Sequence, residues 1–74
     1  MLPQKEIIRR RYRFHGRVQG VGFRYVAERA AQSARASGWV RNEYDGSVSM
    51  ELQGTREQLD RVLSAVRQSF DLST

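Results

Sequence analysis

The chain has no cysteine, a single histidine, a single proline and no long apolar run among its 74 residues. Disulfide bonds and thiolate metal sites are therefore excluded, and one histidine leaves few options for a transition-metal site. A membrane-spanning helix and the hydrophobic region of a signal peptide are both missing. We therefore expect a cytoplasmic protein without metal or cofactor, whose chemistry depends on charge, backbone amides and water.

The chain is short and basic. A chain of this length makes one domain, residues 1–74, near the lower limit at which an adequate core can be buried. Thirteen lysines and arginines against eight acidic residues give a formal net charge of +5. This charge favours anionic partners, but it does not choose between nucleic acid and a small phosphorylated substrate.

Hydrophobic periodicity predicts the first secondary-structure elements. Alternation predicts a strand over Ile7–His15, with arginines on its solvent face. The i, i+3, i+4 spacing of small apolar residues predicts a helix over Phe23–Ala34, for which Gly38 is a natural stop. Two further strands, at residues 39–43 and 48–53, are joined by a short turn.

A second helix is predicted after Gly54. Thr55 and Gln58 form a capping-box pattern, and an apolar stripe continues to Phe70. The order β-α-β-β-α, with two helices that need the same sheet face, predicts an α+β two-layer sandwich with an antiparallel sheet. Trp39 is expected in the core or in a pocket wall. The third strand is expected to turn its other face to solvent, with Ser49, Glu51 and Gln53.

The stretch between the first strand and the first helix, residues 16–24, reads Gly-Arg-Val-Gln-Gly-Val-Gly-Phe-Arg. Glycines let consecutive amides converge on an anion, the helix N-terminus adds partial positive charge, and Arg24 offers a fork for two phosphate oxygens. The spacing matches neither a Walker loop nor the dinucleotide fingerprint. From the residues alone, phosphate binding and a plain tight turn remain equal alternatives.

Residues 16–24 resemble the signature of the acylphosphatase family. A second match follows at Gly38-Trp39-Val40-Arg41-Asn42 and Asp45-Gly46, and the resemblance extends from about Tyr12 to about Phe70. It implies a ferredoxin-like fold whose last strand lies beside the first. Only four residues follow Phe70, so we expect that strand to be missing or truncated. The open edge of the first strand could then support self-association.

The resemblance also implies an activity, the hydrolysis of small acyl phosphates to a carboxylate and inorganic phosphate by in-line attack of a positioned water, without metal. In that family the arginine at the position of Arg24 binds the phosphate, and the asparagine at the position of Asn42 positions the water. A neutral amide holds water without adding negative charge. Backbone amides of the loop complete the phosphate cradle, which here means Arg17, Val18, Gln19, Gly20, Val21 and Gly22.

Two alternatives from other functional classes remain open. A non-catalytic acylphosphatase-like module would keep the same motifs and bind an anion or a partner through a looser cradle. Single-stranded nucleic-acid binding is compatible with the order of elements and the basic charge, but RNA-recognition domains need aromatic residues on the exposed sheet face. The first and third strands supply arginines and polar residues there, so nucleic-acid binding is disfavoured.

Overall fold

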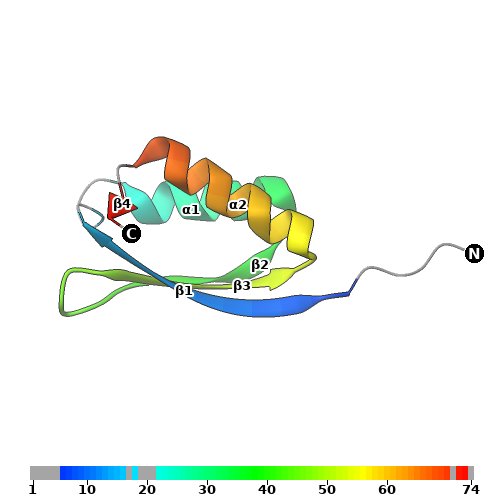
Figure 1. Ribbon diagram of the computed structural model, residues 1–74, viewed down its shortest axis with the longest axis horizontal. Coiled ribbons are helices and arrows are strands. Elements are labelled where there is room, and N and C mark those ends of the chain that lie inside the picture. The colour runs from blue at the N-terminus through cyan, green and yellow to red at the C-terminus, as the bar shows by residue number, and fades with distance from the viewer. Residues whose placement is uncertain (1–5, 17, 19–21, 71, 74) are drawn as a thin grey trace, which may run out of the picture.

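The computed structural model describes residues 6–16, 18, 22–70 and 72–73. The elements in chain order are β1 (Ile8–Gly16), α1 (Phe23–Ala34), β2 (Ser37–Asn42), β3 (Val48–Gly54), α2 (Arg56–Ser69) and β4 (Leu72–Ser73). Both helices lie on one face of the sheet, and the other face carries no helix in the described part of the chain (Figure 1). The predicted α+β two-layer sandwich is confirmed.

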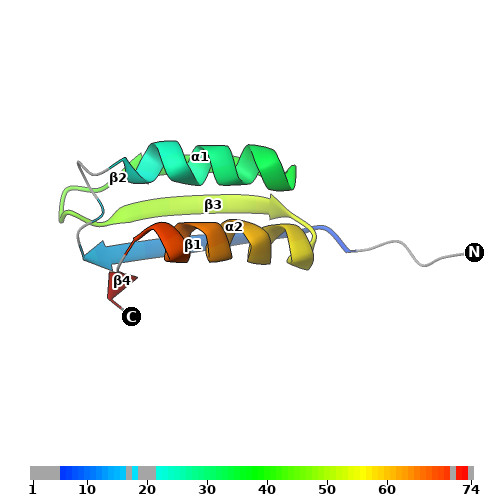
Figure 2. The same ribbon diagram turned by 90° about the horizontal axis from the view of Figure 1, so that it is seen from above.

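The sheet has the strand order β2-β3-β1-β4, and β3 runs antiparallel to both β1 and β2. The strands β1 and β2 are therefore parallel to each other and separated by β3, as in a split β-α-β unit. Both of them end at the side of the molecule where α1 begins, on the left of Figures 1 and 2. This arrangement places the two sequence motifs at the same end of the sheet.

The last strand is present and short. The strand β4 has two residues, which pair with the end of β1 as His15 opposite Ser73 and Gly16 opposite Leu72. It thus lies beside the first strand, as the resemblance implies. Along Ile8–Phe14, the described part of the chain places no strand on this edge of β1.

The core lies between the sheet and the two helices. Its buried side chains are Phe14, Val18, Phe23, Ala27, Ala34, Val48, Met50, Leu52, Leu59, Val62 and Val66. The ring of Phe23, at the start of α1, lies 5.0 Å from the ring of Phe14 and 5.2 Å from that of Phe70. The first turn of α1 is thereby packed against β1 and against the end of α2, which fixes the position of the helix N-terminus.

The N-terminus of α2 confirms the predicted capping box. The backbone N–H of Gln58 donates to Thr55 Oγ1 at 3.2 Å, and the backbone N–H of Thr55 donates to Gln58 Oε1 at 2.8 Å. Two amides that have no partner within the helix are satisfied in this way.

The helix α1 spans the predicted residues, Phe23–Ala34, but the residue that ends it differs from the predicted one. Its cap is Arg35 in a left-handed conformation with φ 61°, whose N–H donates to the carbonyl oxygens of Ala31 and Gln32. The prediction that Gly38 ends this helix is therefore wrong. Gly38 lies in β2, where a Cβ would stand 1.8 Å from the carbonyl oxygen of Glu51, so glycine is required for the close approach of β2 to β3.

On the outer face, Ser49 differs from its prediction and Trp39 agrees with one of its two predicted positions. Ser49 is buried, with 3% of its surface exposed, because the register places it between Arg13 and Arg41 on the neighbouring strands. Trp39 is half-buried, lies outside the core and lines the hollow between α1 and β2, so the pocket-wall alternative of its prediction is confirmed. The guanidinium carbons of Arg11 and Arg41 lie 5.3 and 5.1 Å from its ring centre.

Candidate active site

The first motif ends at a helix N-terminus suited to an anion. Gly22 is the N-cap of α1 and has a left-handed conformation with φ 81°, which glycine adopts without strain. Within the described residues, no side chain caps this terminus and no acidic residue lies in its first turn. The partial positive charge of the first-turn amides is therefore not opposed by the helix itself.

Arg24 is the second residue of α1 and is largely exposed. Its Nη2 lies 3.8 Å from Oε1 of Glu28 one turn further along, and both side chains are more than half exposed. An exposed pair of this kind contributes little free energy. Arg24 can therefore leave Glu28 for a stronger anionic partner at low cost.

The preceding loop is anchored by Val18, which is buried with 1% of its surface exposed. The backbone N–H of Val18 donates to the carbonyl oxygen of Gly16 at 3.0 Å, which closes a tight turn directly after β1. The other predicted members of the cradle before Gly22 lie outside the described residues, and they are Arg17, Gln19, Gly20 and Val21.

The second motif ends at Asn42, the last residue of β2. Asn42 is exposed and stands opposite Val48 in the ladder with β3. By the alternation of the strand it falls on the same sheet face as Val40, which is the face that the helices cover. The position of Asn42 is therefore set by the β2–β3 register.

The turn after β2 is closed by short-range hydrogen bonds. The backbone N–H of Glu43 donates to the carbonyl oxygen of Ser47 at 2.9 Å. Oδ1 of Asp45 accepts from the hydroxyl of Ser47 at 2.5 Å and from its backbone N–H at 3.0 Å. These bonds hold the pKa of the Asp45 carboxyl below its ordinary value. The turn thus fixes the end of the strand that carries Asn42.

The strand order brings the two motifs to the same end of the sheet, and among their described residues no direct hydrogen bond connects them. Both views show the start of α1 and the β2–β3 turn at the same end of the molecule (Figures 1 and 2). No direct hydrogen bond joins Arg24 to Asn42, both of which the structure describes.

Two other charged residues considered in the sequence analysis, Arg41 and His15, make their contacts away from Arg24 and Asn42. Arg41 donates from Nε to Glu43 Oε1 at 2.9 Å and stacks over Trp39 on the helix-free face. Its charge is therefore partly balanced by Glu43. His15 is exposed, as predicted, and its backbone pairs with Ser73.

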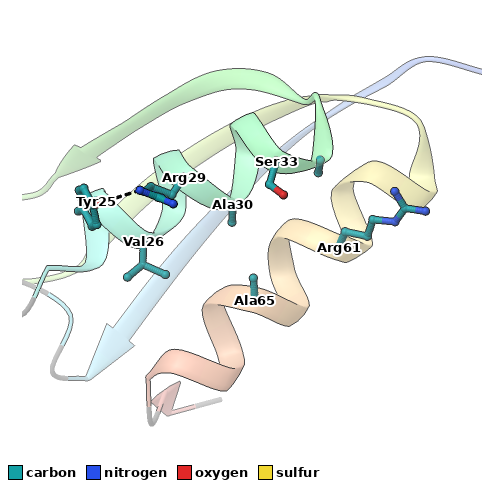
Figure 3. Close-up of a pocket in the computed structure, with 8 residues that line it drawn as sticks. Tyr25, Val26, Arg29, Ala30, Ser33, Arg61 and Ala65 are labelled. Atoms are coloured by element: carbon teal, nitrogen blue, oxygen red, sulfur yellow. Dashed lines mark hydrogen bonds between the residues drawn. The ribbon is translucent and has the colours of Figure 1, made fainter.

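Two hollows flank α1. One, of about 530 Å³, lies between α1 and β2 and has Arg24 in its wall. The other, of about 450 Å³, lies between α1 and α2, where Tyr25 and Arg29 are hydrogen-bonded near one end and Arg61 projects from α2 (Figure 3). The second hollow includes neither Arg24 nor Asn42 in its lining. The groove between α1 and β2 is lined by Arg24 and not by Asn42, so it meets the candidate site at Arg24.

The described residues contain no group of three or more histidine, cysteine or acidic side chains placed to hold a metal ion. In the same part of the chain, no helix combines the length and the apolar character that crossing a membrane requires. The cytoplasmic location stays a prediction.

Comparison with known proteins identifies the family. A family model described as acylphosphatase matches residues 10–74. The chain belongs to the acylphosphatase family. It is 48% identical over 56 residues to an acylphosphatase of Salinibacter ruber, covering 76% of this chain and 59% of that protein. It is 53% identical over 51 residues to an acylphosphatase of Oceanobacillus iheyensis, covering 69% of this chain and 56% of that protein. The chain thus spans less than two thirds of the length of these relatives.

Solved structures of the family have the same fold. The acylphosphatase of Bacillus subtilis superposes with a TM-score of 0.79 at 36% identity, covering 85% of this chain and 69% of that one. An acylphosphatase of Coxiella burnetii superposes with a TM-score of 0.83 at 24% identity, covering 99% of this chain and 82% of that one. The ferredoxin-like arrangement that the resemblance implied is confirmed.

Proposed function

We propose that this acylphosphatase-family chain hydrolyses the carboxyl–phosphate bond of small acyl phosphates, releasing a carboxylate and inorganic phosphate. One observation carries the proposal. The arginine and the asparagine of the two family motifs lie on elements that meet at one end of the sheet, beside a helix N-terminus that no described side chain caps.

The chemistry needs no more than these parts. The leaving group is a carboxylate, the conjugate base of an acid with a pKa of about 4, so it departs without being protonated. No general acid and no metal is required for that departure. The protein has to bind the phosphoryl oxygens, stabilise charge as the bond breaks, and hold a water in line with it.

We assign Arg24 and the first-turn amides of α1 to the phosphoryl oxygens, together with the loop amides of residues 17–22. The guanidinium fork and the helix N-terminus both favour an anion. We assign Asn42 to the attacking water, because an amide accepts and donates hydrogen bonds without repelling the phosphate. The buried side chain of Val18 supports the loop from the core side.

The test is hydrolysis of benzoyl phosphate with EDTA present. Arg24→Ala is expected to abolish phosphate binding and turnover, whereas Arg29→Ala on the same helix serves as the matched control with activity retained. Asn42→Ala is expected to lower turnover by about 10²–10³-fold while inorganic phosphate still binds, the usual effect of losing one preorganised polar group. Equal turnover by Asn42→Ala and the parent would refute the assignment.

The same assay separates the catalytic proposal from the non-catalytic one. A folded chain that binds inorganic phosphate through Arg24 without turning over benzoyl phosphate would be a binding module. Restored turnover on adding a divalent metal would contradict the metal-free mechanism.

A further inference from the structure

The groove between α1 and the edge strand β2 has a distinct composition. Its volume is about 530 Å³, and Arg24 belongs to its wall. Small and apolar residues supply much of the remaining surface, and those used below are Ala27, Ala31, Gly38, Val40 and Leu52.

The groove is open because small residues face each other across it. On the strand side, the wall includes Gly38, which adds no side chain, and Leu52, its partner in the ladder, which is itself buried with 2% exposed. On the helix side, Ala27 is fully buried and Ala31 is half-buried, so neither projects far toward β2. Ala31 and Val40 keep partly exposed apolar surface that a ligand would cover.

Charge is distributed unevenly along the groove. Arg24 begins the wall beside the helix N-terminus, and the polar rim is formed by Glu28, Gln32 and Ser37. A ligand with a phosphate at the Arg24 end and an uncharged apolar body along the alanines matches this distribution. An acyl group with a second negative charge would meet the carboxylate of Glu28.

We propose that this groove binds the acyl group of the substrate and selects apolar acyl groups, aromatic ones included, over short or acidic ones. The proposal rests on the proposed function, because the phosphate at Arg24 fixes which part of the substrate enters the groove. It adds a specificity site formed by Ala31 and Val40, on the opposite side of α1 from the groove of Figure 3.

The kinetic test compares two matched substitutions on α1. Ala31→Leu fills the α1–β2 groove, whereas Ala30→Leu adds the same group one residue earlier, in the groove between the helices. The ratio of kcat/KM for benzoyl phosphate to that for acetyl phosphate is expected to fall at least about tenfold in Ala31→Leu, because a few carbon groups discriminate by that much in an apolar pocket. Ala30→Leu should keep the parental ratio.

Binding of stable substrate analogues tests the groove proposal even if the chain does not turn over substrate. Phenacylphosphonate and acetonylphosphonate are stable analogues in which a CH₂ group replaces the bridging oxygen. The parent is expected to bind the phenacyl compound at least about tenfold more tightly by calorimetry. The chain's single tryptophan, Trp39, also lines the groove, so its fluorescence should respond to the phenacyl compound.

The outcomes distinguish the two proposals. If a folded Ala31→Leu variant turns over substrate with an unchanged ratio of kcat/KM for benzoyl phosphate to that for acetyl phosphate, the groove proposal is refuted. The proposed hydrolytic activity is then unaffected. Tighter phenacyl binding without turnover would support the groove and refute the catalytic proposal. Equal affinity of the parent for phenacylphosphonate and acetonylphosphonate would refute the proposed acyl-binding role of the groove, whether or not the Ala31→Leu variant folds.

Discussion

Gly38→Ala would place a methyl carbon 1.8 Å from the carbonyl oxygen of Glu51 and 2.8 Å from its carbonyl carbon. Both are backbone atoms, so no side chain can move aside to make room. The strand β2 would have to shift away from β3 by more than an ångström, and the ladder on either side of position 38 would lengthen. The φ of 151° at this position adds strain for any residue with a Cβ.

The expected loss of stability follows from these two effects. Positive-φ strain costs about 1–2 kcal/mol, and two lengthened ladder hydrogen bonds cost about 1 kcal/mol each. The free energy of unfolding should therefore fall by about 3–4 kcal/mol, a large part of the roughly 5–15 kcal/mol of a small domain. The control is Gly46→Ala, since Gly46 has a φ of 90° but no atom lies within 4 Å of the place that its new methyl group would occupy. It should lose only about 1–2 kcal/mol, the strain alone.

Urea unfolding followed by the fluorescence of Trp39 measures both values by linear extrapolation. Equal losses in Gly38→Ala and Gly46→Ala would refute the reasoning, because they would show that close approach to Glu51 contributes nothing. Since β2 also carries Asn42, a folded fraction of Gly38→Ala should in addition turn over less acyl phosphate.

Three further predictions concern the turn, the helix cap and the open edge. The bonds from Ser47 lower the pKa of Asp45, so the stability that this carboxyl contributes is present above about pH 4 and is lost as the pH falls through its folded pKa. The protection of the Ser47 amide proton from exchange, relative to the intrinsic exchange rate at each pH, should fall over that range in the parent, and a flat profile of this protection would contradict the prediction. Thr55→Ala should lower the free energy of unfolding by about 1 kcal/mol in thermal melts, with Thr55→Ser close to the parent. Association of two chains through the edge of β1 should grow with salt in light scattering, because the arginines of that strand repel until screened, and a decrease with salt would exclude this edge.

Most elements of the fold were predictable because their signals are local. The alternation of arginines with apolar residues in β1 and the capping box at Thr55 involve residues within a few positions of each other. Such patterns depend on strand and helix geometry and require no knowledge of distant neighbours. The helix cap at Arg35 escaped prediction, because a left-handed arginine has no residue signature and Gly38 offered a more conventional stop.

The site was predictable only as a set of residues. Arg24 and Asn42 are 18 positions apart in the sequence, and the motif resemblance named both. Their placement at one end of the sheet follows from the split β-α-β order. The groove between α1 and β2 was missed, because an alanine stripe has the same sequence signature whether it is covered or left open.

The sequence by itself determined the kind and order of the first five elements, the family and the residues of the two motifs, since these depend on periodicity and on residue identity. Tertiary structure alone decided what depends on neighbours across the sheet. The burial of Ser49 between two arginines, the position of Trp39 outside the core and the need for glycine at position 38 are set by the register of β1, β2 and β3. Register joins residues far apart in the chain, and no local pattern encodes which of them will touch.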